Sequence, residues 1–260
     1  MRIEVAGSTH VGMVRPHNED TYLLLPEENL FVVADGMGGH ASGEIAARAA
    51  VEALEAFFRR TSDARAITWP FGVDPARPWP ENRLVVGIHE ANARVVELAA
   101  QDPSRQGMGT TLVSLHVGEG RAWLGWAGDS RAYRLRGGAL EQLSEDHSLV
   151  NDLVKARRLT PEQARSFPHR NVVVRALGMK EPLAVDVRSE PAEAGDLFLL
   201  CSDGLSSMVD DGRIADVLRR ATDLERAAQQ LVDAANAAGG LDNVTVVLAR
   251  IVGPADGDGP

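Results

Sequence analysis

The chain has 260 residues, enough for one large domain or two small ones, and its 44% hydrophobic and 25% charged content is typical of a globular protein. A net charge of −10 argues against nucleic-acid binding, because such proteins neutralise phosphates with Lys and Arg. The sequence has neither the ~18 consecutive apolar residues of a membrane span nor the apolar core of a signal peptide, so we expect a cytoplasmic protein.

Short apolar runs predict about nine strands, at residues 2–8, 21–25, 30–35, 111–117, 122–129, 131–138, 183–190, 196–203 and 243–251. Helical patterns lie at residues 42–60, 81–100, 148–157 and 223–238. Several strands follow one another through tight turns, and the helices come in pairs. This order favours an α+β fold with antiparallel sheets over alternating βαβ units.

Two segments are expected to lack regular structure. Residues 69–80 contain four prolines and two tryptophans, so they should form a loop between the first two helices, to which we assign no chemistry. Residues 253–260 have the composition of a flexible acidic tail.

Four aspartates stand where an apolar run ends or begins: Asp35 in LFVVADG, Asp129 in WLGWAGDSR, Asp203 in LFLLCSDG and Asp242 in GGLDNVTVVL. Each alone is typical of a turn. If several of these strand ends meet at one edge of the fold, the carboxylates repel one another unless divalent cations neutralise them. Oxygen ligands without a Cys or His cluster select Mg²⁺ or Mn²⁺ over Zn²⁺. Spacing alone leaves their convergence open.

The segment GMVRPHNED places Arg15 four and five residues before Glu19 and Asp20. One interpretation is a solvated loop with a surface ion pair. The other is a phosphate clamp beside a metal site, since a guanidinium matches phosphoryl oxygens and the acids hold the metal or its waters.

Seven motifs in this order resemble the metal-dependent (PPM, type 2C) serine/threonine protein phosphatases in their bacterial form. They are RPHNED, VVADGMGGHASGE, GMGTTLVSL, AGDSRAYRLR, LTPEQARSFPHRNVVVRALG, LLCSDGLSSMV and DNVTVVL. The resemblance covers about residues 5–251. It implies a central β-sandwich of two mostly antiparallel sheets flanked by helix pairs, with a binuclear metal centre at one end. Residues 1–252 would form a single catalytic domain, with a flap at about residues 146–178 beside the active site. Within the flap, Thr160 and the two residues after it predict a capped helix turn, followed by a loop through Pro168 and a strand. Whether the flap influences substrate access or is only a docked connector stays open.

The resemblance also implies the metal ligands. Asp35 would bridge two Mn²⁺ or Mg²⁺ ions, and the carbonyl of Gly36 would bind one of them. Asp203 and Asp242 match the acids that complete the coordination of the first ion. Asp129 resembles a ligand of a third, weaker ion that is shared with Asp203.

Other matched positions would bind phosphate or support the site. Glu19 and Asp20 match the pair at the metal-bound waters, and Arg15 matches the phosphate-binding arginine. Three further matched residues are expected to support the site rather than react: Thr110, Thr111 and Asn243.

The general acid has no direct match, because eukaryotic members carry His where this chain has Met37. His40, three residues on, is the candidate, and the alternative is a polar residue beside a helix start. The other six histidines show no ligand spacing. The chain has a single cysteine, Cys201, so an internal disulfide is excluded. Its apolar neighbours predict that it is a small buried hydrophobic residue. With water as the nucleophile, neither Cys201 nor Ser202 needs to react.

The implied reaction is hydrolysis of phosphoserine and phosphothreonine in proteins by water activated between two metal ions, in a monomer that opposes a bacterial Ser/Thr kinase. Two alternatives stay open. A closed pocket would favour a small-molecule phosphate-ester hydrolase on the same scaffold, and a lost metal ligand would favour a non-catalytic phosphoprotein-binding pseudophosphatase. A nucleotide-binding module at GMGGHASGE is weaker, because its glycines do not fit G-x-G-x-x-G.

Overall fold

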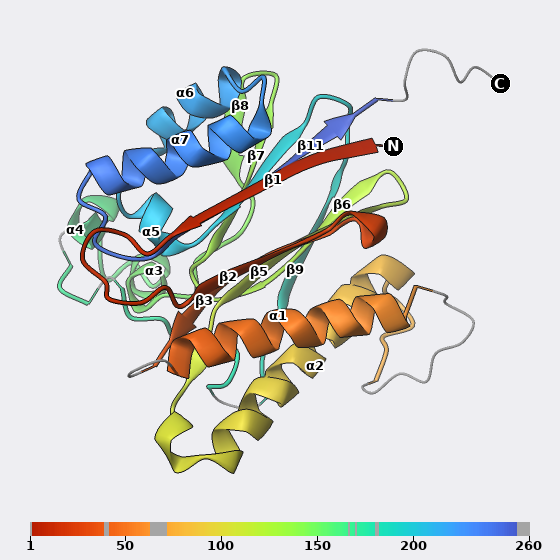
Figure 1. The fold of residues 1–260 in the computed structure, drawn as a ribbon, viewed down its shortest axis with the longest axis vertical. Coiled ribbons are helices and arrows are strands. Elements are labelled where there is room, and N and C mark those ends of the chain that lie inside the picture. The colour runs from red at the N-terminus through yellow and green to blue at the C-terminus, as the bar shows by residue number, and fades with distance from the viewer. Residues whose placement is uncertain are drawn as a thin grey trace.

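The computed structural model describes residues 2–38, 42–62, 72–165, 167–169, 171–179 and 182–253. These residues form four layers, in which two β-sheets lie face to face and helices cover the outer face of each sheet (Figure 1). None of the helices in these ranges is both long and apolar enough to cross a membrane. The predicted α-β-β-α sandwich is confirmed.

All the neighbouring strands described in the two sheets pair antiparallel. The first sheet runs in the order β1 (Arg2–His10), β11 (Val244–Val252), β10 (Leu197–Cys201), β7 (Arg131–Arg136) and β8 (Ala139–Gln142). The second runs in the order β2 (Asp20–Leu25), β3 (Leu30–Met37), β5 (Leu112–Gly118), β6 (Arg121–Ala127) and β9 (Asp186–Pro191), and the short β4 (Gly109–Thr110) pairs with β3.

The helices form two covers and one smaller group. The second sheet is covered by α1 (Ser42–Arg60) and α2 (Trp79–Gln101), and the first by α5 (Asp203–Ser206), α6 (Asp211–Arg219) and α7 (Leu224–Ala237) (Figure 1). The segment between β8 and β9 carries α3 (Leu149–Lys155) and α4 (Pro161–Arg165). Two 3₁₀ turns, η1 (Pro26–Glu28) and η3 (Pro103–Arg105), complete the set.

Strand β3 shows why Asp35 follows an unbroken apolar run. Phe31 and Val33 face the core between the sheets, whereas Val32 and Ala34 face the core beneath α1 and α2. Side chains alternate across a strand, so a strand buried on both faces must be apolar at every position. The run therefore ends at the point where the strand reaches the pocket described below.

The structure differs from the sequence prediction in five strands and α-helices. The short strands β4 and β8 and the helices α5 and α6 were not predicted. The strand predicted at the end of the flap is wrong, because the described residues there make only two isolated bridges, Ser148 with Val173 and Thr110 with Leu177. The expected cap of α4 is present: the Thr160 hydroxyl accepts from the Gln163 amide N–H at 3.3 Å.

The predicted loops are only partly described. The loop expected at residues 69–80 is shorter at its far end, since α2 begins at Trp79 and Pro80 lies in the first turn, where its missing N–H is not needed. Residues 69–71 and 254–260 lie outside the described residues.

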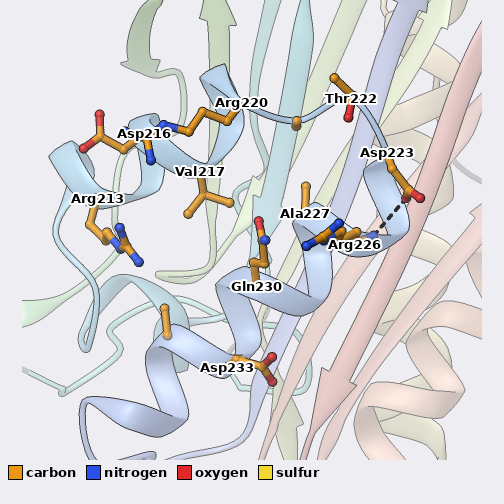
Figure 2. Close-up of a pocket in the computed structure, with 12 residues that line it drawn as sticks. Arg213, Asp216, Val217, Arg220, Thr222, Asp223, Arg226, Ala227, Gln230 and Asp233 are labelled. Atoms are coloured by element: carbon orange, nitrogen blue, oxygen red, sulfur yellow. Dashed lines mark hydrogen bonds between the residues drawn. The ribbon is translucent and has the colours of Figure 1, made fainter.

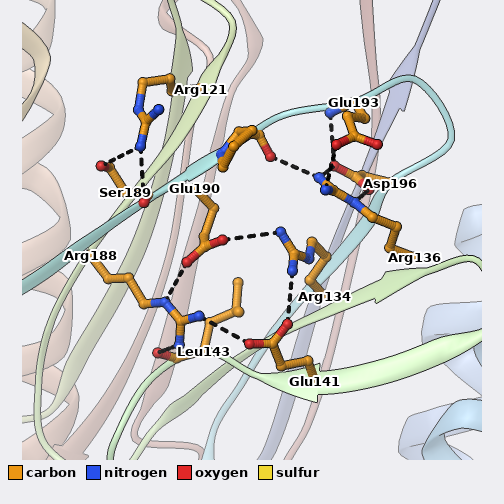
Figure 3. A network of polar contacts seen from close by, with 11 residues as sticks. Arg121, Arg134, Arg136, Glu141, Leu143, Arg188, Ser189, Glu190, Glu193 and Asp196 are labelled. Atoms are coloured by element: carbon orange, nitrogen blue, oxygen red, sulfur yellow. Dashed lines mark hydrogen bonds and ion pairs between the residues drawn. The ribbon is translucent and has the colours of Figure 1, made fainter.

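Ion pairs connect the outer edges of the two sheets (Figure 3). Arg134 of β7 contacts Glu141 of β8 at 2.8 Å and Glu190 of β9 at 3.3 Å. Arg188 of β9 completes the group, with contacts of 3.0 Å to Glu141 and 2.7 Å to Glu190. Because β7 and β8 belong to one sheet and β9 to the other, these contacts link the sheets. Each partly exposed pair contributes at most about 1 kcal/mol.

Candidate active site

A pocket of about 230 Å³ brings together most of the predicted site. Its walls come from the loop between β1 and β2, the end of β3, the turn between β6 and β7, the start of α5 and the loop before β11. The predicted residues that line it are Arg15, Glu19, Asp35, Gly36, Asp129, Asp203 and Asp242. Carboxylates that are far apart in the sequence therefore share one pocket.

Asp20, predicted with Glu19 at the metal-bound waters, does not line this pocket. It is 7% exposed and stands opposite Asp35 in the register of β2 and β3. Its Oδ2 accepts a hydrogen bond from Ser202 Oγ at 2.8 Å, while its buried Oδ1 has no partner among the described residues. Burial raises the pKa of Asp20 to about 7. A buried carboxylate oxygen without a donor is costly, which favours a cation or a proton beside it.

The other carboxylates are also held away from their ordinary ionisation. Burial, followed by the charges of neighbouring acids, raises the pKa of Asp35 well above its usual value, that of Asp129 to about 7 and that of Asp203 to about 6. Such a concentration of like charge attracts cations. The site thus has the electrostatics of a cation-binding pocket.

The donor chemistry fits a hard divalent cation, because the ligands offered are carboxylate and carbonyl oxygens. Within the described ranges, however, no three His, Cys, Asp or Glu side chains already stand as a formed metal-binding group. The acids share a pocket and an electrostatic field without forming a ready-made set of ligands.

Glycine is required at position 36 by close packing. A Cβ atom there would lie 2.2 Å from the Gly43 carbonyl oxygen and 2.6 Å from that of Glu19. Only a residue without a side chain lets β3 approach both the start of α1 and the loop that carries Glu19. The glycine therefore brings Asp35 and Glu19 into one site.

Two threonines hold the backbone of Asp35. The Asp35 carbonyl accepts from Thr110 Oγ1 at 2.9 Å and from the Thr111 N–H at 2.8 Å. The Asp35 N–H donates to Thr111 Oγ1 at 3.2 Å. Both threonines therefore support the backbone of Asp35, which is the supporting role that the resemblance implies.

Asn243 holds the loop that carries Arg15 and Glu19. Its Nδ2 donates to the carbonyls of Val11 and His17, each at 2.9 Å. Its Oδ1 accepts from the Glu19 N–H at 2.8 Å. One side chain thus fixes this loop against the start of β11.

Arg15 has a different partner from the one that sequence spacing suggested. Its Nη2 donates to Asp242 Oδ2 at 2.7 Å, and the Arg15 side chain is 51% exposed. This hydrogen bond is the main reason that the pKa of Arg15 is raised. The local ion pair with Glu19 or Asp20, one of the two interpretations of the sequence, is not formed; Arg15 pairs across the pocket instead, which places the guanidinium at the pocket rim.

The flap contributes two residues that the sequence did not single out, since Asn171 and Val173 line the pocket. The sequence left open whether the flap is only a docked connector, and these two residues place part of it in the pocket wall. Met37 also lines the pocket, whereas His40 lies outside the described residues, so its role as general acid stays a prediction.

Cys201 and Ser202 have no accessible nucleophilic atom. Both are 0% exposed, and burial raises the pKa of the Cys201 thiol to about 12. The Ser202 hydroxyl donates to Asp20 and accepts from the Thr245 N–H at 2.9 Å. The prediction that Cys201 is a buried hydrophobe is confirmed.

A cavity of about 450 Å³ between α6 and α7 contains none of the predicted site residues (Figure 2). Its charged lining is balanced, with three arginines and three aspartates: Arg213, Arg220, Arg226, Asp216, Asp223 and Asp233. It therefore lacks the excess of carboxylates that marks the pocket at Asp35.

Comparison with known proteins shows the family of the chain. The sequence profile of Protein phosphatase 2C matches residues 7–243. Serine/threonine phosphatase stp of Listeria welshimeri is 35% identical over 93% of this chain and 93% of its own length. Protein phosphatase PhpP of Streptococcus pneumoniae is 37% identical over 96% of this chain and 98% of its own length.

Solved structures show the same architecture. The crystal structure of the serine/threonine phosphatase PstP/Ppp of Mycobacterium tuberculosis has a TM-score of 0.85 at 34% identity, and the match covers 97% of this chain and 100% of that one. A catalytic domain of PstP in complex with two manganese ions matches with a TM-score of 0.81 at 34% identity, over 96% and 99% of the two chains. The chain belongs to the protein phosphatase 2C family.

Proposed function

We propose that this chain hydrolyses phosphoserine and phosphothreonine in proteins at the pocket formed by Asp35, Asp203 and Asp242, with two Mn²⁺ or Mg²⁺ ions as cofactors. Its class follows from its family: it is a protein serine/threonine phosphatase. The observation that supports the proposed chemistry is the shared pocket itself, in which acids from three distant segments face one arginine.

The same pocket supports the proposed ligand set. Asp35 would be shared by both ions, the Gly36 carbonyl would bind one of them, and Asp203 and Asp242 would complete the coordination of the first ion. When bound, the two cations supply positive charge that lowers the pKa of water and neutralises phosphoryl oxygens. Asp129, 8% exposed at the pocket edge, is proposed with Asp203 for a third, weaker ion.

Glu19 and Asp20 are proposed to hold water molecules around the ions. Glu19 lines the pocket, and burial raises its pKa. Asp20 lies behind it and presents the unpartnered Oδ1. Residues 1–252 are proposed as the catalytic domain, with the flap at about residues 146–178.

A protein substrate is favoured by the shape around the pocket. A second cavity of about 300 Å³ adjoins it and shares Asp129, Asn171 and Asp203 with it. An extended surface of this kind suits a polypeptide better than a small ester, which a closed pocket would enclose. The opposing Ser/Thr kinase, the cytoplasmic location and the monomeric state remain predictions.

Arg15→Ala is expected to raise the KM for a phosphothreonine peptide roughly tenfold to a hundredfold, because a charge-assisted contact to phosphate is lost. Binding of Mn²⁺ should be kept, since Arg15 contributes no ligand oxygen. Steady-state kinetics and calorimetric titration with Mn²⁺ measure the two effects. Arg15→Lys is the control, because it keeps the charge but not the planar fork. Loss of Mn²⁺ binding in Arg15→Ala would show instead that the arginine only stabilises the loop.

The direct test is phosphate release from a phosphothreonine peptide with Mn²⁺, with Mg²⁺ and with a chelator, beside a small aryl phosphate. We expect release only with a metal ion and a higher kcat/KM for the peptide. A preference for the small ester would favour the small-molecule hydrolase. Peptide binding without release would favour the pseudophosphatase.

A further inference from the structure

His147, near the start of the flap, holds the residue that precedes Asp129. Its backbone N–H donates to the Gly128 carbonyl at 2.9 Å, and its ring Nδ1 accepts from the Gly128 N–H at 3.0 Å. The histidine is 6% exposed. One residue of the flap therefore engages both the N–H and the carbonyl of Gly128, in the turn that carries Asp129 into the pocket.

The hydrogen bonds on the two sides of the ring define its protonation. Since Nδ1 accepts a hydrogen bond, the ring proton lies on Nε2, which donates to Asp186 Oδ2 at 3.1 Å. Arg175 Nη1 donates to Asp186 Oδ1 at 2.7 Å and lies 3.1 Å from Nε2. Trp126 stacks on the ring, with centroids 6.3 Å apart. Burial lowers the pKa of His147, which favours this neutral form.

The same residue fixes the flap wall of the pocket. The His147 carbonyl accepts from the Val174 N–H at 2.9 Å, and Ser148 forms a bridge with Val173. Val173 lines the pocket that contains Asp35 and Asp129. A shift of His147 would therefore move both the Asp129 turn and the flap wall.

Gly128 connects His147 to the residues that hold Asp35. Its φ is +125°, and a Cβ atom there would lie 2.4 Å from Thr111 Cβ. Thr111 in turn accepts the Asp35 N–H. The turn is thus packed between the histidine and the threonine that holds Asp35, with little room to adjust.

We propose that His147 is a positioning residue of this phosphatase: its neutral imidazole ties the Asp129 turn to the flap, so that Asp129 and Val173 keep their places in the pocket. The inference rests on the proposed function, because it assigns Asp129 to the weakest cation site. His147 contacts no reacting atom in this scheme and acts through Gly128.

The test compares three variants. His147→Phe keeps an aromatic ring against Trp126 and removes the Nδ1 acceptor. His147→Asn returns an acceptor at the position of Nδ1. Asp186→Asn leaves the Nδ1 hydrogen bond in place and serves as the matched control: an amide oxygen can still accept from Nε2, while the ion pair with Arg175 loses its anion.

We expect His147→Phe to weaken the weakest class of Mn²⁺ binding in calorimetry roughly fivefold to tenfold, and to raise the KM for a phosphothreonine peptide by a similar factor with kcat changed less, as the loss of one buried hydrogen bond implies. His147→Asn should recover most of both losses, and Asp186→Asn should show neither. Hydrogen exchange at the Gly128 and Val174 amides should rise in His147→Phe alone.

Wild-type Mn²⁺ binding and KM in a folded His147→Phe would overturn the inference, and so would equal losses in His147→Phe and Asp186→Asn, which would indicate a general packing role. If His147→Phe does not fold, the comparison of His147→Asn with Asp186→Asn decides, since equal defects in these two contradict positioning. If the wild-type chain shows no metal-dependent phosphate release, the proposed function is refuted. The calorimetric comparison of Mn²⁺ binding between the wild type and the His147 variants would still test the positioning role of His147.

Discussion

Asp35→Asn is expected to lower the turnover of a phosphothreonine peptide at saturating Mn²⁺ by roughly a thousandfold, because the anionic ligand that we propose to be shared by two ions becomes a neutral one that binds hard cations poorly. The fold should remain, since the backbone of Asp35 is held by Thr110 and Thr111 and not by its carboxylate. Initial rates across a Mn²⁺ titration measure the effect. Near-wild-type turnover at saturating Mn²⁺ would contradict the proposed role of Asp35.

The same substitution should make the protein more stable in the presence of a chelator. Burial and the charges of Asp20, Asp203 and Asp129 raise the pKa of Asp35, so its ionised form is unfavourable in the folded chain. A neutral amide removes that repulsion, and a gain of about 1 kcal/mol corresponds to ~2–4 °C in Tm. Thermal unfolding in chelator at pH 8 tests this sign.

Asp196→Asn is the matched control, since Asp196 is a buried aspartate outside the pocket. It is 1% exposed, and Arg136 donates to both of its carboxylate oxygens at 2.6 Å. We expect this variant to lose about 1–3 kcal/mol of unfolding free energy, because a charge pair is broken, and to keep full turnover. A loss of stability in Asp35→Asn like that in Asp196→Asn would mean that the pocket carboxylates serve the fold.

Stabilisation by Mn²⁺ is expected to increase with pH. In the metal-free chain, the folded-state pKa values of Asp20 and Asp129 are about 7 and that of Asp203 is about 6, all above the ordinary value of 3.8. The folded state therefore binds more protons than the unfolded state between these limits, and stability falls as pH rises from about 4 towards 7. Asp129 alone contributes about 2 kcal/mol between pH 8 and pH 5.5.

The pKa shift of His116 changes the stability of the folded chain in the opposite direction. Burial lowers its pKa to about 4 from 6.5, so the stability that it contributes is present above pH 6.5 and is lost as pH falls towards 4. At pH 5.5 this loss is about 1.4 kcal/mol, less than the combined effect of the acids. The metal-free protein should therefore have a higher Tm at pH 5.5 than at pH 8.

Divalent cations compete with these protons, so binding should be tighter at the higher pH. At a concentration of about a hundred times Kd, Mn²⁺ should raise Tm by ~5–10 °C at pH 8 and by clearly less at pH 5.5. Differential scanning calorimetry with Mn²⁺ and with chelator, at pH 5.5 and at pH 8, gives the four Tm values to compare. An equal shift at both pH values would show that Mn²⁺ does not displace protons from these acids.

Local sequence patterns were sufficient for much of the fold. The apolar periodicity of residues 42–60 predicted α1 with the bounds that the structure has. Burial of β3 on both faces explains why its apolar run is unbroken and still predicts a strand. The short β4, β8 and α5 were missed because two to four residues provide too little periodicity to register, and the nine-residue α6 was missed as well.

For the site, the sequence identified the acids, and the resemblance of its motifs supplied their roles. Neither could predict that Arg15 pairs with Asp242, that Asp20 is buried behind the pocket, or that Val173 of the flap lines it. These contacts depend on the register of strands and the packing of loops that are distant along the chain. Periodicity and turn chemistry describe a residue and its near neighbours, whereas distances across a sandwich exist only after both sheets have formed.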